Sequence, residues 1–266
     1  MVKYVVGICL VIAVLYVIIF FVTCYKIDHF VFNPSMMNKD HVFELPFEFE
    51  EIYLPNGNPK APEIHSIYAP INKEPKKVLL YLHGNSDDLR KWALLMTRFH
   101  NYGYDVMMVD YPGFGKTRGS AGEKVLYESA DALMKWTNER YRPDQIVVLG
   151  RSMGCVPASY IASKHSVERV IIETPFANIG LLLRKLVPFI PVCPGLYKKY
   201  PVDQYLKKTQ APIYLIRSGK DDLTVLESSH SLVPLAQKEY LIKGADHRNF
   251  VTMKAYDEAI HDIFSK

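Results

Sequence analysis

The sequence has no large excess of charge of either sign. Its 266 residues include 32 Lys and Arg against 28 Asp and Glu, a formal net charge of +4. Proteins that follow a nucleic-acid backbone carry a concentrated basic stripe, so nucleic acid is not expected as a partner. Hydrophobic residues make up 49% and charged residues 23% of the chain. That composition is typical of a folded protein and excludes disorder as the dominant state.

Cysteine is also scarce. The 4 cysteines, at positions 9, 24, 155 and 193, are too few for a disulfide scaffold and lack the paired spacing of zinc ligands. The chain has no H-x-x-x-H pair, no G-x-G-x-x-G at the first crossover and no G-x-x-x-x-G-K-[ST] phosphate loop. We therefore expect neither a bound metal nor a nucleotide cofactor.

One long apolar run stands at the start of the chain. Residues 2–23 read VKYVVGICLVIAVLYVIIFFVT, with Lys3 as the only charge before Lys26. About 20 residues of helix cross a hydrocarbon core of roughly 30 Å. A signal peptide is the rival interpretation, but its apolar part is usually shorter and no A-x-A-like cleavage site follows this run. A lipid-modified Cys24 is a weaker alternative. We predict an uncleaved transmembrane anchor over residues 1–26.

The side of the membrane that holds the rest of the chain is left open. The amino terminus and Lys3 on one flank roughly balance Lys26 and Lys39 on the other, so the positive-inside rule does not decide.

Residues 27–266 are expected to form one α/β domain, in which strand-like and helix-like runs alternate. Such alternation predicts a mainly parallel sheet, here of eight strands, with helices on both faces. The first two strands lack a helix between them and are expected to form an antiparallel edge hairpin joined through residues 55–59. The strands are expected at residues 48–54, 63–68, 78–82, 104–109, 145–149, 170–172, 213–216 and 239–242, and the helices at 87–102, 123–140, 153–163, 226–236 and 249–264.

A G-x-S-x-G motif, residues 150–154, follows the strand predicted at 145–149 and precedes a helical run. In such a motif the serine sits on a sharp strand-to-helix turn, and flanking glycines avoid collisions with neighbouring strands. We expect the Ser152 hydroxyl to stand above the sheet as a nucleophile. The pattern alone is only moderately specific, and its position between strand and helix strengthens it.

Two backbone amides near this serine are candidate oxyanion donors. The sequence His83-Gly84-Asn85 follows the strand at 78–82, in the place where a serine hydrolase supplies one N–H group, and the residue after the nucleophile supplies the other. Asn85 and Met153 are the expected donors. The alternative is an ordinary turn that uses Gly and Asn for their backbone freedom.

A catalytic triad also needs an acid and then a histidine later in the chain. His247 follows the last predicted strand, and an acidic pair, Asp221 and Asp222, follows the strand at 213–216. His247 is expected to accept the Ser152 proton while a carboxylate orients its ring. From the residues alone, Asp222, Asp221 and Glu173, at the end of another strand, are all candidates for that acid.

These motifs together resemble the α/β-hydrolase superfamily from about residue 45 to the end of the chain. The resemblance rests on His83-Gly84-Asn85, the Asp110 to Gly115 loop, the Ser152 motif followed by Pro157, the acidic loop and His247. It is nearest to single-anchor membrane members that include lysophospholipase-like and depalmitoylase-like enzymes.

The resemblance implies a role for each of these positions. Ser152 is the nucleophile and His247 the base, and the family's spacing after a glycine selects Asp222 as the acid, although Leu226 stands where proline is usual. The Asp110 loop is implied to shape the pocket rather than to join the triad.

Residues 174–212 are expected to form a small helical cap. Its apolar side chains either face the acyl part of a substrate or complete the core beneath the cap. Lys198, Lys199, Lys207 and Lys208 form a basic edge that faces either anionic lipid or solvent.

The expected function is that of a membrane-anchored serine hydrolase that cleaves an ester or thioester of a small lipid-like molecule or an acylated protein. A serine peptidase of the same fold, or a tethered binding protein without catalysis, are the alternatives. The oligomeric state is not predicted.

Overall fold

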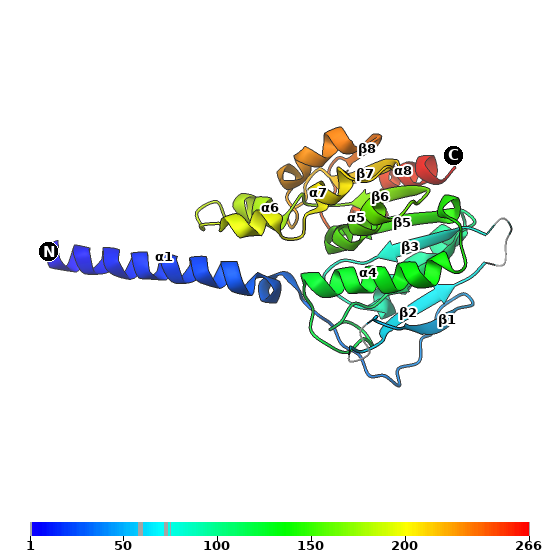
Figure 1. Cartoon of the computed structure of the whole chain (residues 1–266). Helices are drawn as coiled ribbons and strands as arrows, with labels where there is room; N and C mark the ends of the chain where they lie inside the picture. The colour runs from blue at the N-terminus through cyan, green and yellow to red at the C-terminus, as the bar shows by residue number, and fades with distance from the viewer. Residues whose placement is uncertain (1, 58–60, 72–73, 75, 266) are drawn as a thin grey trace.

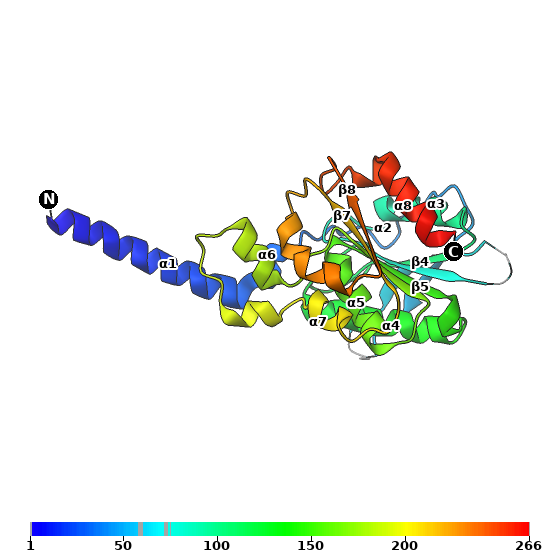
Figure 2. The same cartoon turned by 90° about the horizontal axis from the view of Figure 1, so that it is seen from above.

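The long apolar run forms a helix that projects from the rest of the molecule. A computed structural model describes residues 2–57, 61–71, 74 and 76–265. Helix α1 (Val2–Val31) extends away from a body of strands and helices (Figures 1 and 2). Within the described residues it is the one helix long and apolar enough to cross a membrane, with a mean hydropathy of 3.3 in a window that is 0% buried.

The end of α1 packs on the body. The helix bends at Lys26, where the backbone leaves the helical region (φ −119°, ψ 17°). Beyond the bend, Ile27 and Phe32 are buried in the core, and Met37 and Phe43 follow them into a second core. The bend at Lys26 lies directly before residue 27, where the folded domain is expected to begin.

The body contains the predicted eight-stranded sheet, with strand order β1-β2-β4-β3-β5-β6-β7-β8. β1 and β2 pair antiparallel at one edge and β2 is antiparallel to β4, whereas the other neighbours are parallel. The predicted fold class and edge hairpin are confirmed; residues 58 and 59 of its connection lie outside the described residues. The strands are β1 (Glu50–Leu54), β2 (Ile64–Ala69), β3 (Val78–Leu82), β4 (Asp105–Val109), β5 (Ile146–Arg151), β6 (Arg169–Glu173), β7 (Ile213–Ser218) and β8 (Lys238–Ile242).

Helices cover both faces of the sheet, and each face has its own core. Along β3, Val78, Leu80 and Leu82 pack in one core, whereas Leu79 and Tyr81 pack in the other. This alternation is that of a strand buried on both faces. In Figure 2, α4 and α5 lie on one side of the sheet and α3 and α8 on the other. The helices after α1 are α2 (Leu89–Trp92), α3 (Met96–His100), α4 (Glu123–Asn138), α5 (Cys155–Lys164), α6 (Ile179–Leu186), α7 (Val202–Leu206) and α8 (Lys254–Phe264).

Three predicted helices differ from the structure. The run at 249–264 begins with the 3₁₀ turn η6 (Phe250–Thr252), and α8 starts at Lys254. The run at 87–102 is divided into α2, the 3₁₀ turn η1 (Ala93–Leu95) and α3; three residues per turn bring Ala93 and Met96 onto one buried face. The run at 226–236 is a 3₁₀ segment, η5 (Leu226–Leu235), that contains Pro234. Pro234 has no N–H group to donate, which limits how far this segment extends as a helix.

A buried polar network fixes the loop after β4. The Asp110 carboxylate is fully buried, lies 2.7 Å from His65 Nδ1 and accepts a hydrogen bond of 3.1 Å from the Leu89 N–H. The other His65 ring nitrogen lies 3.0 Å from Glu51. A Cβ atom at Gly115 would stand 1.9 Å from Asp110 Oδ2, which explains the glycine. Asp110 thus holds β2, α2 and this loop together.

Replacing Asp110 should therefore destabilise the fold. Asp110→Ala leaves the His65 ring and the Leu89 N–H without their buried acceptor, a loss that costs about 3–5 kcal/mol. Thermal unfolding of the full chain in detergent measures it. Asp40→Ala, at an exposed position, is the control and should change stability by about 0.5 kcal/mol or less. Equal melting temperatures for the two variants would contradict this account.

Candidate active site

Ser152 occupies a strained turn between β5 and α5. Its φ is +54°, in the left-handed region that costs a residue with a side chain about 1–3 kcal/mol. At this turn the backbone at Gly150 and at Gly154 lies very close to neighbouring backbone atoms. A Cβ atom at Gly154 would stand 1.9 Å from the Leu82 carbonyl oxygen, and one at Gly150 would stand 2.4 Å from the Gly154 carbonyl oxygen. The two glycines are therefore required by the geometry that presents the serine at the carboxyl ends of the strands.

Ser152 is the first of three side chains joined by hydrogen bonds. His247 Nε2 lies 3.1 Å from Ser152 Oγ, and His247 Nδ1 lies 2.9 Å from one oxygen of Asp221 and 3.1 Å from the other. These contacts suit a histidine that donates through Nδ1 to the carboxylate and accepts the serine proton at Nε2. Ser152 and His247 are 9% and 8% exposed, so a substrate can reach them from one side.

The acid that meets His247 is Asp221, so the preference for Asp222 is wrong. Asp222 is exposed. Asp221 Oδ1 accepts hydrogen bonds from the backbone N–H groups of Leu223 (3.0 Å) and Thr224 (2.7 Å), and this local turn aims its carboxylate inward. The glycine-based spacing of the family is displaced by one residue here, in the same loop where Leu226 replaces the usual proline.

Glu173, the third candidate, is also separate from the histidine. It is fully buried at the end of β6 and accepts a hydrogen bond of 2.7 Å from the Tyr256 hydroxyl. Burial raises the pKa of the Glu173 carboxyl, which favours its neutral form. A structural role under α8 accounts for these contacts.

The environment of Asp221 keeps it ionised. Burial by itself raises its pKa, but hydrogen bonds from His247 and Thr224 outweigh burial, and the pKa of the carboxyl falls below its ordinary value. The Thr224 hydroxyl also lies 2.7 Å from Asp221 Oδ2 and 3.0 Å from the Thr174 carbonyl oxygen. Thr224 thus fixes the carboxylate, a role that no sequence motif indicated.

The two expected oxyanion donors flank Ser152 in different ways. Met153 is the second residue of the 3₁₀ turn η3 (Ser152–Gly154), which leads into α5. Asn85 lies in the loop after β3 and lines the cavity that Ser152 also lines. The Asn85 side chain donates to the Val31 carbonyl, and the backbone carbonyl of Asn85 accepts from the Asn33 N–H at 3.1 Å. The chain just after α1 therefore fixes the position of this loop.

The cavity beside Ser152 has a volume of about 450 Å³. Its wall includes Asn33, Trp92, Leu223 and Val251, which provide both apolar and polar surface. No described residue between 174 and 212 lines it. Of the two alternatives for the apolar side chains of the cap, a position facing this cavity is therefore not observed. Part of the cap, such as the buried Leu196, completes the core.

Arg151 is a further residue of the site that the sequence analysis did not single out. Its guanidinium lies 5.1 Å from the centre of the Trp92 ring and 4.6 Å from that of Phe250. It also donates weakly, at 3.4 Å, to the carbonyl of His247. Arg151 occupies a variable position of G-x-S-x-G, so the motif gave no signal for it. It braces the loop that carries the histidine.

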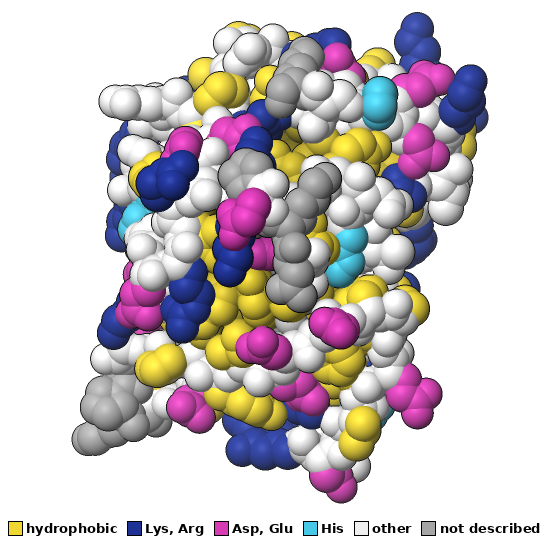
Figure 3. Space-filling model, turned by 90° about the vertical axis from the view of Figure 1, so that its right-hand side faces the viewer, with side chains coloured by type: hydrophobic (Ala, Val, Ile, Leu, Met, Phe, Trp, Pro, Cys, Tyr) yellow, Lys and Arg dark blue, Asp and Glu magenta, His cyan; other side chains and the backbone are white. Residues whose placement is uncertain are grey.

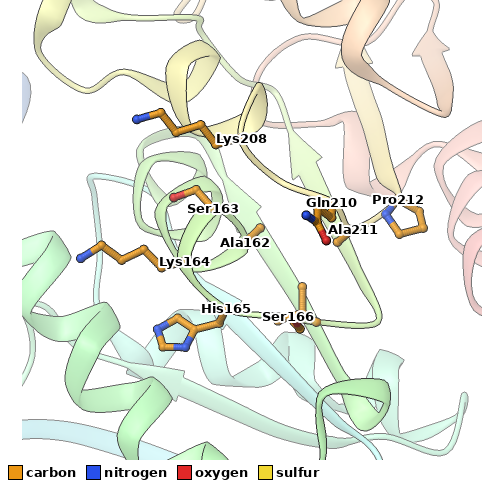
Figure 4. Close-up of a pocket in the computed structure, with 10 residues that line it drawn as sticks. Ala162, Ser163, Lys164, His165, Ser166, Lys208, Gln210, Ala211 and Pro212 are labelled. Carbon is orange, nitrogen blue, oxygen red and sulfur yellow. The ribbon is translucent and has the colours of Figure 1, made fainter.

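A second hollow of about 340 Å³ lies at the far end of α5 (Figure 4). Lys164, His165 and Lys208 line it, and none of the three triad side chains does.

Over the part of the chain that the structure describes, no three His, Cys, Asp or Glu side chains gather as a metal site would require.

Comparisons with known proteins identify sequences and structures that are similar to this chain. A family model described as "Serine aminopeptidase, S33" matches residues 73–202. The chain is thus similar to α/β hydrolases in sequence and has the α/β-hydrolase fold. Alpha/beta hydrolase domain-containing protein 17C of Homo sapiens is 28% identical over 200 residues, 70% of this chain and 57% of that protein. An uncharacterized protein of Mycobacterium tuberculosis is 27% identical over 176 residues, 64% of this chain and 63% of that one. The chain thus spans less than two thirds of these relatives.

Solved structures share the fold at low sequence identity. An esterase of Pyrococcus furiosus superposes with a TM-score of 0.66 at 18% identity, covering 88% of this chain and 96% of the esterase. A thermostable carboxyl esterase of Bacillus coagulans gives 0.62 at 19% identity, covering 82% and 97%. These likenesses support the α/β-hydrolase fold.

Neutralising the two adjacent aspartates should separate their roles. Asp221→Asn removes the acceptor that orients His247 and stabilises its imidazolium, so the rate at which a fluorophosphonate modifies Ser152 should fall by about 10³–10⁴-fold. Asp222→Asn is the matched control and should stay within about twofold, because loss of a single exposed charge barely perturbs a site. Loss of reactivity in Asp222→Asn instead would contradict the assignment of Asp221.

The lowered pKa of Asp221 also predicts a pH dependence of stability. A carboxyl with a folded-state pKa below its unfolded value of about 3.9 stabilises the fold above that pH and loses the contribution as the pH falls through the folded-state pKa. The difference in unfolding free energy between the wild-type chain and Asp221→Asn should therefore shrink below about pH 4. Denaturant titrations at several pH values measure it; a difference independent of pH would refute it.

Proposed function

We propose that the chain is a membrane-anchored serine hydrolase that cleaves carboxylic ester or thioester bonds. The observation that carries the proposal is the hydrogen-bonded series from Ser152 through His247 to Asp221, at the mouth of a cavity of about 450 Å³. A serine paired with a buried histidine and carboxylate is the arrangement that activates a hydroxyl for acyl transfer.

The proposed reaction has two halves. Ser152 Oγ attacks the substrate carbonyl as His247 Nε2 takes its proton, and the N–H groups of Asn85 and Met153 stabilise the oxyanion. His247 then protonates the leaving alcohol or thiol, and an acyl-enzyme forms. A water molecule, deprotonated by the same histidine, releases the acid and restores Ser152. Asp221 stays ionised and orients the ring throughout.

The anchor favours lipid-like or acylated substrates. Asn33, in the cavity wall, is only a few residues beyond the end of α1 at Val31. The cavity wall is therefore close along the chain to the end of the apolar run at Thr23. A substrate held in the same bilayer reaches such a site without leaving the membrane surface. Within this proposal residues 1–26 form the anchor and residues 27–266 the hydrolase domain, with residues 174–212 as its cap.

A peptidase is the second candidate, because the matching family model is described as a serine aminopeptidase. Such an enzyme binds the positively charged amino terminus of its substrate. Asp87 is an acidic residue that lines the cavity, and it is already paired with Lys91 at 2.9 Å. The ester or thioester assignment is therefore preferred.

Labelling of the full chain in detergent micelles with a fluorophosphonate tests the proposal. The wild-type chain should label, and Ser152→Ala should lose both labelling and turnover, by about 10⁴-fold or more. Ser86→Ala, which removes another hydroxyl from the same cavity wall, is the control and should still label. A folded chain that does not label would overturn the proposal in favour of a tethered binding protein.

A substrate panel then separates ester from peptide cleavage. p-Nitrophenyl esters and acyl thioesters of increasing chain length should be cleaved, whereas aminoacyl p-nitroanilides should not, because an amide nitrogen is the poorer leaving group and the site lacks a free carboxylate to bind the amino terminus. Faster cleavage of the anilides would replace the ester proposal with the peptidase.

A further inference from the structure

The cap carries an apolar tip that has no place in the catalytic cavity. Between α6 and the 3₁₀ turn η4 (Pro194–Lys198), the Phe189 side chain is 89% exposed, and Leu186 at the end of α6 is 42% exposed. Pro188 and Pro191 restrict the backbone of this turn. Adjacent large apolar side chains held open in this way indicate a contact with another apolar phase.

This tip lies beside α1. An apolar groove of about 400 Å³ separates them, lined on one side by Ile18, Ile19 and Val22 of α1, and on the other by Val187 and residues 190–192 of the cap. Both views show α6 and the loop after it running alongside the helix (Figures 1 and 2).

Polar contacts hold the cap to α1 just beyond the groove. Asp28, after the bend of α1, accepts hydrogen bonds from Lys199 Nζ at 2.9 Å and from the Tyr200 hydroxyl at 2.7 Å. The position of the tip relative to the helix is therefore fixed rather than incidental.

The depth of the groove identifies the phase. Ile18, Ile19 and Val22 belong to the apolar run of residues 2–23, which the proposed function places in the hydrocarbon core. The cap residues on the other wall of the groove lie at the same depth, near the edge of the hydrocarbon core, because they face these α1 residues across one groove. Water does not fill an apolar groove at this depth, whereas the acyl chains of the bilayer do.

The charges around the tip fit the same boundary. From Thr174 to Val202 the sequence has four basic residues, Arg184, Lys185, Lys198 and Lys199, and no acidic one. Arg184 and Lys185 are exposed directly before Leu186. An apolar tip with a basic collar is typical of segments that lie in a membrane interface, where the cations meet lipid phosphates. At the opposite end of the molecule, side chains of both signs are interspersed (Figure 3).

We propose that residues 186–192 are a second membrane contact, in which Leu186 and Phe189 insert among the acyl chains beside α1 while Arg184 and Lys185 bind anionic headgroups. The inference rests on the proposed anchor and adds an orientation to it. A single transmembrane helix can still tilt and rotate in the bilayer, and a domain fixed to it moves with it. Two contacts hold the catalytic cavity at one height and direction above the bilayer.

Fluorescence quenching in vesicles tests the contact. Phe189→Trp in the full chain is reconstituted into phosphatidylcholine and phosphatidylserine vesicles with or without lipids brominated on their acyl chains. The emission gained over the wild-type chain, which already contains Trp92 and Trp136, should fall by about half or more in brominated vesicles, as expected for a side chain below the headgroups. Tyr53→Trp, on edge strand β1 and 41% exposed, is the control and should gain emission that bromine does not quench.

Alkaline carbonate extraction of the same vesicles separates the two proposals. If the chain resists extraction and the emission of Phe189→Trp is not quenched, the second contact is wrong and the anchor stands. If carbonate releases the chain, the anchor itself is wrong and the inference falls with it. Resistance together with quenching supports both.

The basic collar has its own readout. Quenching of Phe189→Trp should be stronger in vesicles with phosphatidylserine than in vesicles of phosphatidylcholine alone, and the double substitution Arg184→Gln with Lys185→Gln should remove that difference. Quenching that does not depend on anionic lipid in either protein would overturn the role of the collar.

Discussion

The close approach of α5 to the end of β3 is the constraint on which the candidate site depends. The turn at Ser152 exists because residue 154 has no side chain, since a Cβ atom there would stand 1.9 Å from the Leu82 carbonyl oxygen. That contact allows the chain to leave β5 and enter α5 within three residues, and it forces Ser152 to φ +54°. Burial of β3, β5 and α5 in the surrounding cores supplies the stability that keeps this strained residue in place.

Much of the architecture was predictable because the inner strands β3 to β7 are buried on both faces. Such strands read as short apolar runs, and the antiparallel edge was recognised from the missing helix between β1 and β2. Local helix type was less predictable. The apolar spacing of residues 226–236 does not distinguish the 3₁₀ form of η5 from an α-helix, and the division of the run at 87–102 depends on which side chains the sheet buries.

Some residues of the candidate site were predictable from the sequence, and others were not. Ser152 and His247 follow from strand ends and chain order, and the structure brings them together at 3.1 Å. Two adjacent aspartates cannot be told apart by such spacing, because a shift of one residue in a loop reverses which carboxylate points inward. Here hydrogen bonds from the N–H groups of Leu223 and Thr224 select Asp221. The apolar character of the cap was visible in sequence, whereas its direction, toward α1 and away from Ser152, depends on tertiary contacts through Asp28.

The contacts of Asn85 connect the end of α1 to the loop beside Ser152. Its side chain donates to the Val31 carbonyl at the end of α1, and its backbone carbonyl accepts from the Asn33 N–H, so the end of α1 holds the loop that carries a proposed oxyanion donor. A shift of that end relative to the sheet would displace the Asn85 N–H from the carbonyl oxygen it is proposed to bind, and such donors act only within about 3 Å of their target. Under the proposed function, the ion pair of Asp28 with Lys199 would fix the end of α1 against the cap and so keep the proposed oxyanion donor in place.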